Sequence, residues 1–67
     1  MIALTVNGEP RRFDAPMSIA ALLVSLQLQG KRVAVECNGE IVPRSRHGET
    51  PLNDGDRLEI VVAVGGG

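Results

Sequence analysis

The chain has 67 residues, enough for one small domain, and its hydrophobic content of 43% beside 22% charged residues is ordinary for a folded protein. A net charge of -1 and a single aromatic residue, Phe13, exclude the basic stripe and the base-stacking platform of nucleic-acid-binding proteins. No stretch approaches the roughly 20 apolar residues that cross a bilayer, and the lone cysteine cannot form an internal disulfide, so we expect a cytoplasmic protein without a membrane partner.

The first 13 residues predict a β-hairpin. Ile2, Leu4 and Val6 alternate with smaller or polar side chains, which is the period of a half-buried strand. Asn7-Gly8 is a turn pair that tolerates positive φ, so the chain can return through residues 11–13 as a second strand.

The next segment predicts an amphipathic helix. Four branched aliphatic side chains recur on one stripe: Ile19, Leu22, Leu23 and Leu26. Ser18 is the predicted N-cap, because its hydroxyl can accept a hydrogen bond from a free amide of the first turn, and Met17 can pack on Leu22 as a hydrophobic staple. Gly30 is the predicted end of the helix, since a residue with positive φ commonly closes one.

The second half predicts three more strands. Residues 33–37 alternate in the manner of a strand that ends at the Asn38-Gly39 turn, and residues 41–42 predict a short fourth strand. Residues 44–53 are predicted as loop. A cluster of Asn, Asp and Gly then leads to a last strand, on which one face carries Leu58, Ile60 and Val62.

This order of elements predicts an α+β domain of the β-grasp, or ubiquitin-like, class, because a single helix can cover only one face of the sheet. The mixed sheet has four to five strands, and its first and last strands lie side by side in the middle and run parallel. The expected domain spans residues 1–64, followed by a flexible Gly-Gly-Gly tail at residues 65–67. The side chains expected beneath the helix are Ile2, Leu4, Val6, Leu58 and Ile60. The opposite face would carry Ala3, Thr5, Ala34, Glu36, Glu59, Val61 and Ala63.

The glycine tail is the most informative feature of the sequence. Gly65, Gly66 and Gly67 follow an apolar strand without a polar spacer. Glycine has no Cβ, so such a tail can thread into a narrow cleft that side chains would block. The pattern predicts a tail that offers its carboxylate to another enzyme, and the alternative is a frayed end or a linker.

Other residues whose side chains could take part in catalysis or metal binding are interpreted as structural. Cys37 falls in the apolar phase of its strand and is interpreted as a packing residue rather than a persulfide carrier. His47 lacks a ligand set at metal spacing and is expected to shape its loop or to be solvated, while Arg44 could bind a phosphate, a partner carboxylate or nearby loop carbonyls. Asp54 and Asp56 are interpreted as turn residues, with Asp54 capping its own turn, rather than as a calcium site or an acid-base pair. We therefore predict no catalytic residue, no metal site and no enzyme.

Several motifs follow one another along the chain: Asn7-Gly8, the capped helix, Ile41-Val42-Pro43-Arg44, Asp54-Gly55-Asp56 and Ala63-Val64-Gly65-Gly66-Gly67. Taken together they resemble the ThiS family of thiamin-biosynthesis sulfur carriers, and the likeness covers the whole chain. The departures are mild. Cys37 stands where an aliphatic residue is expected, and His47 stands where an aromatic residue or a histidine is usual.

The resemblance implies chemistry at Gly67 alone. A ThiF-type adenylyltransferase would use ATP and Mg²⁺ to adenylate the Gly67 carboxylate, with Gly65 and Gly66 in its cleft, while the carrier itself binds no cofactor. A sulfur donor protein would then convert the adenylate to a thiocarboxylate, which supplies sulfur to a ThiG-type thiazole synthase. The partner-docking face would include Val61, Ala63, Ala34 and Glu59, unless these are simply a poorly covered strand, and the free carrier is expected to be a monomer.

Other proteins share this ending. One alternative is the small subunit of molybdopterin synthase, or another carrier with a Gly-Gly end that serves cysteine synthesis or tRNA thiolation. A different class of alternative is a non-catalytic β-grasp interaction module in which the glycines are inert.

Overall fold

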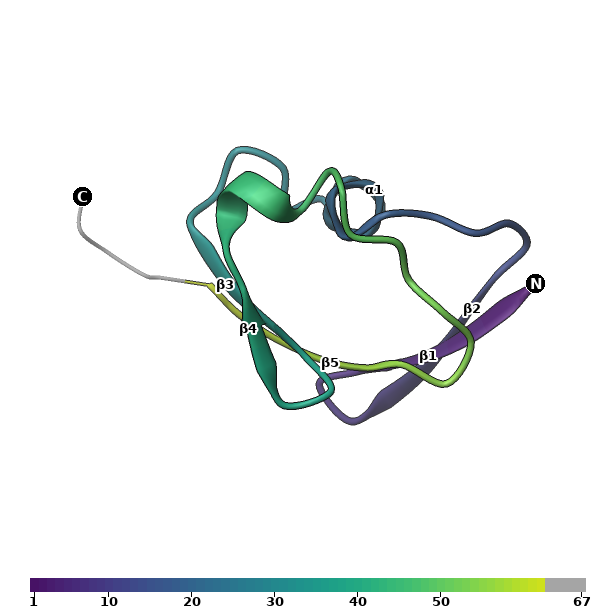
Figure 1. Ribbon diagram of the computed structural model, residues 1–67. Coiled ribbons are helices and arrows are strands. Elements are labelled where there is room, and N and C mark those ends of the chain that lie inside the picture. The colour runs from purple at the N-terminus through teal and green to yellow at the C-terminus, as the bar shows by residue number, and fades with distance from the viewer. Residues whose placement is uncertain (63–67) are drawn as a thin grey trace.

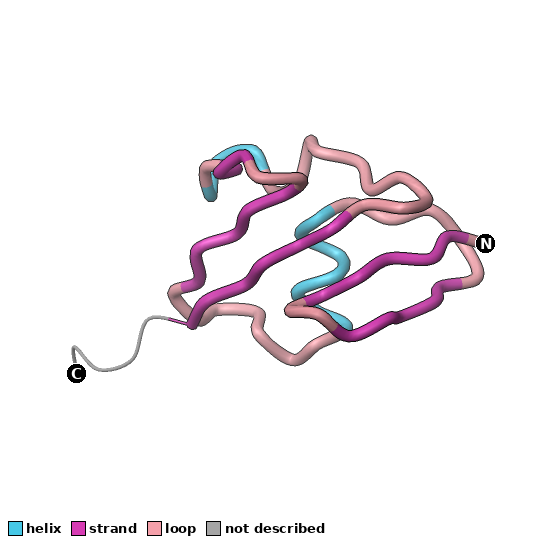
Figure 2. Tube along the Cα trace, turned by 90° about the horizontal axis from the view of Figure 1, so that it is seen from below, coloured by secondary structure: helices cyan, strands magenta, loops and turns pink. Residues whose placement is uncertain are grey.

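A five-stranded mixed sheet carries one helix across one of its faces in the computed structural model of the chain, which describes residues 1–62 (Figure 1). Residues 63–67 lie outside the described part. The elements in chain order are β1 (Ile2–Val6), β2 (Glu9–Phe13), α1 (Ile19–Ser25), β3 (Val33–Cys37), β4 (Glu40–Val42), the 3₁₀ turn η1 (Arg44–Arg46) and β5 (Arg57–Val62). Figure 2 views the sheet from the face opposite the helix. The predicted fold class is confirmed.

The strand β5 occupies the middle of the sheet, whose order is β2-β1-β5-β3-β4. It runs parallel to β1, with Val6 opposite Leu58, and antiparallel to β3, with Val35 opposite Ile60. The expected parallel pairing of the first and last strands is therefore confirmed. Because of it, β1 begins at one end of the sheet and β5 finishes at the other (Figure 1).

The core lies between the helix and the sheet. The five strand residues expected beneath the helix are all buried, and from the helix Ile19 and Leu22 are completely inaccessible. The remaining buried apolar side chains are Leu23, Val35 and Leu52. Val62 lines a hollow together with Ile60 and Leu28, so it shares the face of Ile60 as expected, but it is exposed. It belongs to the last pair of the sheet, opposite Val33, which is itself only half-buried.

The helix begins where the sequence predicts and ends earlier. Ser18 Oγ accepts a hydrogen bond from the Ala21 N–H at 3.1 Å, which confirms the N-cap. At the other end, Gln27 takes the left-handed conformation (φ 62°), its N–H donates to the Val24 carbonyl, and the Leu28 N–H donates to the Leu23 carbonyl at 2.8 Å. This pair of bonds is a Schellman motif.

The prediction that Gly30 ends the helix is wrong. Gly30 also has positive φ (81°), but it lies farther along the loop to β3. The Schellman motif places Leu28 just beyond the helix end, and Leu28 packs against the core. An apolar residue at this position commonly accompanies the motif, so tertiary packing selects Gln27 as the closing residue.

The segment after β4 is more ordered than a plain loop. It contains η1, and Pro51 forms an isolated bridge with Ser18 at the start of the helix. The Ala20 N–H donates to the His47 carbonyl at 3.0 Å, so the segment is bonded directly to the first helical turn. The sequence predicted residues 44–53 as loop, and the 3₁₀ turn within them was not anticipated.

Candidate functional site

The residues predicted to carry the chemistry lie outside the described part of the chain. This applies to the predicted modification site Gly67, to the predicted cleft residues Gly65 and Gly66, and to Ala63 of the predicted docking face. The structure describes the strand that leads to them. The last described residue of that strand, Val62, stands opposite Val33 at the start of β3.

The other predicted docking residues lie together on the face away from the helix. Ala34 and Val61 are direct partners in the β3–β5 register, and Glu59 stands opposite Glu36. The Val61 side chain is 62% exposed. The structure therefore brings Ala34, Glu59 and Val61 into one exposed patch, in which they line a hollow of about 50 Å³.

Ile41 belongs to the same patch and was not predicted there. It lies on β4 opposite Glu36, contributes to the same hollow and is 74% exposed. A signal for it existed in the sequence. A two-residue Asn-Gly turn pairs residue 37 with 40 and residue 36 with 41, so Ile41 must share a face with Glu36, which was expected to point away from the helix.

The patch combines apolar side chains with a cross-strand pair of like charges. Glu36 and Glu59 are direct partners, and both are exposed. Like charges directly opposite each other on a sheet are unfavourable. Within residues 1–62 the one ion pair joins Arg11 and Glu9 at 3.8 Å, on the other side of the sheet, so neither carboxylate of the patch takes part in an ion pair there. The patch, defined by Ala34, Glu36, Ile41, Glu59 and Val61, is called the outer patch below.

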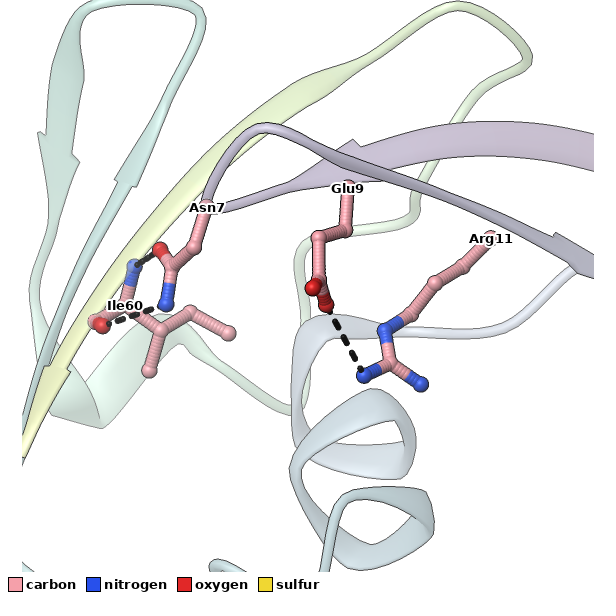
Figure 3. Close-up of polar contacts among 4 residues, drawn as sticks. All are labelled: Asn7, Glu9, Arg11 and Ile60. Carbon is pink, nitrogen blue, oxygen red and sulfur yellow. Dashed lines mark hydrogen bonds and ion pairs between the residues drawn. The ribbon is translucent and has the colours of Figure 1, made fainter.

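The carboxyl end of β5 is bonded to the first turn of the chain (Figure 3). Asn7 Oδ1 accepts from the Ile60 N–H at 2.7 Å, and Asn7 Nδ2 donates to the Ile60 carbonyl at 3.1 Å. We call this pair of bonds the Asn7 bridge. Nearby on β2, Glu9 and Arg11 form the exposed ion pair, which contributes little stability because water screens it.

The turn that precedes β5 is held by two aspartates. Asp56 Oδ2 accepts from the Asn53 N–H at 2.8 Å, and Asp54 Oδ1 accepts from the Ala3 N–H at 2.7 Å. The interpretation of both aspartates as turn residues is confirmed, but their roles differ from the prediction. Asp56 caps the turn, whereas Asp54 reaches across to β1, because the turn packs directly beside that strand.

Cys37 is half-buried and packs against the core, as predicted. Burial raises the pKa of its thiol, and the nearby Asp56 carboxylate raises it further. Since the thiolate is the nucleophile, a raised pKa makes this thiol a poor one at neutral pH.

His47 and Arg44 occupy the η1 segment. His47 is only 6% exposed, and its Nε2 lies 3.1 Å from the Val42 carbonyl oxygen, so it shapes the loop and is not solvated. One of the alternatives for Arg44, hydrogen bonds from its side chain to nearby loop carbonyls, does not occur within residues 1–62. Arg44 is exposed, and its own carbonyl accepts from the His47 N–H at 3.2 Å.

Residues 1–62 contain no cluster of three or more His, Cys, Asp or Glu side chains that could hold a metal ion. None of the helices in this part of the chain is long and apolar enough to span a membrane.

The strand order, the parallel central pair and the single crossing helix define a β-grasp domain of the ubiquitin-like class. Residues 4–67 match the model of the ThiS family, and the chain belongs to that family. It is 50% identical to the sulfur carrier protein ThiS of Bacillus subtilis over 96% of this chain and 98% of that protein. The crystal structure of the thiamine biosynthesis protein ThiS from Geobacter metallireducens superposes with a TM-score of 0.83 at 38% identity, covering 98% of this chain and all of the other.

A further relative is much longer. The thiazole synthase of Paramagnetospirillum magneticum is 52% identical over 64 residues, which is 96% of this chain but 20% of that protein. The chain thus spans about a fifth of the length of this relative.

Proposed function

We propose that this chain is a sulfur carrier of thiamin biosynthesis that acts as a co-substrate rather than as an enzyme. The observation that carries the proposal is the match to the ThiS family, which extends through the glycine tail to residue 67. The fold supports it, because β5 is held between two neighbours and leads directly to that tail.

The reacting group is the carboxylate of Gly67. A free C-terminal carboxyl group has a pKa of about 3.5, so at neutral pH it is an anion that resists nucleophilic attack. A ThiF-type adenylyltransferase with ATP and Mg²⁺ would couple the carboxylate oxygen to the α-phosphorus and release pyrophosphate. A sulfide-level nucleophile from a sulfur donor protein then displaces AMP, which leaves with one carboxylate oxygen, and the product is a thiocarboxylate.

The thiocarboxylate would donate its sulfur to a thiazole synthase. The similarity to the Paramagnetospirillum thiazole synthase supports this partnership. In that protein a segment about one fifth of its length corresponds to 96% of the present chain. Gly65 and Gly66 would occupy the narrow cleft of the partner, where only glycine leaves room for the approaching backbone.

The outer patch is the surface that we assign to partner docking, together with Ala63. Its exposed Ile41 and Val61 supply apolar contact area, and Glu36 and Glu59 supply a paired negative charge. A lysine or arginine of the partner would relieve the repulsion between the two carboxylates, so binding would gain from charge complementarity. Ile41→Asp should then weaken binding while leaving Gly67 chemically unchanged.

The test of the proposed function is the mass of the chain after reaction. Incubation with a ThiF-type adenylyltransferase, ATP, Mg²⁺ and a sulfur source should raise the intact mass by about 16 Da, because sulfur replaces one oxygen. Fragmentation should place the change at Gly67. Sulfur found on Cys37 instead would contradict the proposal.

Two tail variants separate the carrier from an inert interaction module. Deletion of Gly67 moves the carboxylate by up to about 3.5 Å, and a misplacement of ~1 Å can already cost about a hundredfold in rate. Gly66→Val adds a β-branched side chain that fills the cleft. Both should abolish adenylation with an unchanged circular dichroism spectrum. Wild-type activity in both would return the chain to the interaction-module class.

A further inference from the structure

We propose that Asn7 is a positioning residue that fixes the direction in which β5 delivers the tail to the adenylylating partner. The inference rests on the proposed function and goes beyond it, because it assigns a role in the reaction to a side chain of the first turn. It is carried by the two hydrogen bonds of the Asn7 bridge.

The Asn7 bridge extends the β1–β5 ladder past the point where β1 stops. The main-chain N–H of Asn7 donates to the Leu58 carbonyl at 2.9 Å. In a regular parallel ladder the carbonyl of that same residue would accept from the N–H of Ile60. The chain instead turns into β2, with Asn7 at φ 51° and Gly8 at φ 82°.

The Asn7 carboxamide fills the vacated place in the ladder. Its Oδ1 accepts from the Ile60 N–H at 2.7 Å in place of the main-chain oxygen. Its Nδ2 donates to the Ile60 carbonyl at 3.1 Å, as the N–H two positions further along a longer strand would do. The side chain thus supplies the acceptor and the donor that a longer β1 would present to Ile60, and Figure 3 shows it facing the backbone of Ile60.

The Asn7 bridge lies near the end of β5 that leads to the tail. Ile60 is two residues before the end of β5, and it is 6% exposed. On its other side β5 is held by β3 as far as the pair Val33–Val62. Without the bridge, the N–H and the carbonyl of Ile60 would both lose their partners, and this part of the strand would move toward water to satisfy them.

Such a movement would change the direction in which β5 arrives at Val62, the last described residue before the tail. Catalysis by the partner depends on a carboxylate oxygen placed against the reacting phosphorus, and a misplacement of ~1 Å is enough to cost about a hundredfold in rate. Docking depends on the outer patch, which the Asn7 side chain does not line. Loss of the bridge should therefore lower kcat more than it raises KM.

The chain contains a matched control at the other end of the same strand. Asn38 also has positive φ (53°), precedes a glycine with positive φ (Gly39, 87°), and accepts the Arg57 N–H at its Oδ1 at 3.0 Å. We call this contact the Asn38 bridge. Glycine at either position keeps the left-handed backbone and removes only the carboxamide.

The experiment compares Asn7→Gly with Asn38→Gly in steady-state adenylation of the full chain, with amide exchange of Ile60 followed by NMR. Both variants are assayed at a temperature at which circular dichroism shows them fully folded. Asn7→Gly should lower kcat about 10- to 100-fold, with KM changed by less than about threefold, and should lose exchange protection at Ile60. Asn38→Gly should keep kcat within about twofold of wild type and keep the protection at Ile60.

Two results would overturn the inference. One is wild-type kcat for Asn7→Gly in spite of lost protection at Ile60. The other is an equal fall in kcat for both variants, which would assign the effect to general stability. Failure of the proposed function looks different, because the wild-type chain itself would then not be adenylated.

Discussion

The two Asn-Gly turns of this protein use the same chemistry at opposite ends of β5. In each, the asparagine takes a left-handed backbone conformation, and its carboxamide oxygen accepts a β5 N–H: Ile60 for Asn7 and Arg57 for Asn38. They differ in what the amide nitrogen meets. Asn7 Nδ2 donates to a neutral carbonyl, whereas Asn38 Nδ2 donates to the Asp56 carboxylate at 3.0 Å.

Because of this difference, the two ends of β5 have different electrostatic surroundings. At the Asn38 end a nearly buried carboxylate, Asp56, also holds the turn through the Asn53 N–H. Hydrogen bonds to charged groups contribute about 1.5–3 kcal/mol, roughly twice those between neutral groups. The Asn38 end is therefore the stronger support of the strand, and the neutral Asn7 end, which leads to the tail, is the weaker one.

The sharpest test of this comparison replaces each asparagine by aspartate. Asn38→Asp places a second carboxylate against Asp56, and we expect a loss of about 3 kcal/mol in unfolding free energy at pH 7. Asn7→Asp places an oxygen against the Ile60 carbonyl, without a second charge within hydrogen-bond distance among residues 1–62. Here the expected loss in unfolding free energy is about 1–2 kcal/mol. Urea unfolding measures both.

The pH dependence separates charge repulsion from loss of a hydrogen bond. In folded Asn38→Asp the introduced carboxyl has a pKa raised above its unfolded value by the neighbouring charge. Its penalty is therefore present at neutral pH and shrinks as the pH falls through that raised pKa. A deficit relative to wild type that stays constant from pH 7 to pH 4 would contradict the charge argument.

Removal of the Asp56 carboxylate should have the next largest effect on the free energy of unfolding. Asp56→Ala leaves the Asn53 N–H and the Asn38 Nδ2 without their acceptor in a nearly buried site, and we expect a loss of about 2 kcal/mol. Asp54→Ala is the control, because its single bond to the Ala3 N–H is exposed and should contribute about 1 kcal/mol or less. Equal losses in thermal unfolding would mean that the burial of Asp56 does not matter.

Gln27 tests whether the asparagine side chains, rather than the left-handed backbone, stabilise the turns. Gln27 shares the positive φ of Asn7 and Asn38, yet no hydrogen bond of its side chain occurs within residues 1–62. Gln27→Gly should stabilise the protein by about 0.5 kcal/mol, because relief of left-handed strain exceeds the added freedom of the unfolded chain. Asn7→Gly and Asn38→Gly should destabilise it. Stabilisation by all three would refute a role for the carboxamides.

The pKa of the Cys37 thiol is sensitive to the Asp56 carboxylate at the Asn38 end of β5, and the effect expected here is the smallest. Burial and the Asp56 carboxylate raise its pKa, so the rate of alkylation by iodoacetamide should have its pH midpoint above that of an ordinary thiol. Because folding raises this pKa, the protonated thiol contributes to the free energy of unfolding at neutral pH, and this contribution is lost as the pH rises through the raised pKa. Asp56→Asn should lower the midpoint, and an unchanged midpoint would show that the Asp56 carboxylate does not raise the pKa of Cys37.

Much of the candidate site could be anticipated before the structure. Alternation predicted Ala34, Glu59 and Val61 on one outer face, and the structure confirms it. The resemblance of the motifs to the ThiS family implied Gly67 as the modification site. Ile41 was missed although turn length and register would have placed it there. The tail residues themselves lie outside the described part, so their assignment stays a prediction.

Local patterns in the sequence were sufficient for the elements that depend on near neighbours. The Ser18 cap bonds a residue three positions away, and the two-residue turns at Asn7 and Asn38 join adjacent strands. Periodicity likewise identified the buried stripe of the helix and the apolar faces of β1 and β5. Each of these follows from backbone geometry and side-chain burial over a few residues.

Only the tertiary structure decided the rest, because the partners are far apart in the chain. Asn7 and Ile60 are separated by 53 positions, and Ala3 and Asp54 by 51. The docking of Leu28 on the core selected Gln27 rather than Gly30 to close the helix. A carboxamide or carboxylate can bond any peptide group that folding brings within about 3 Å, so its partner is determined by the packing of strands and not by its local sequence.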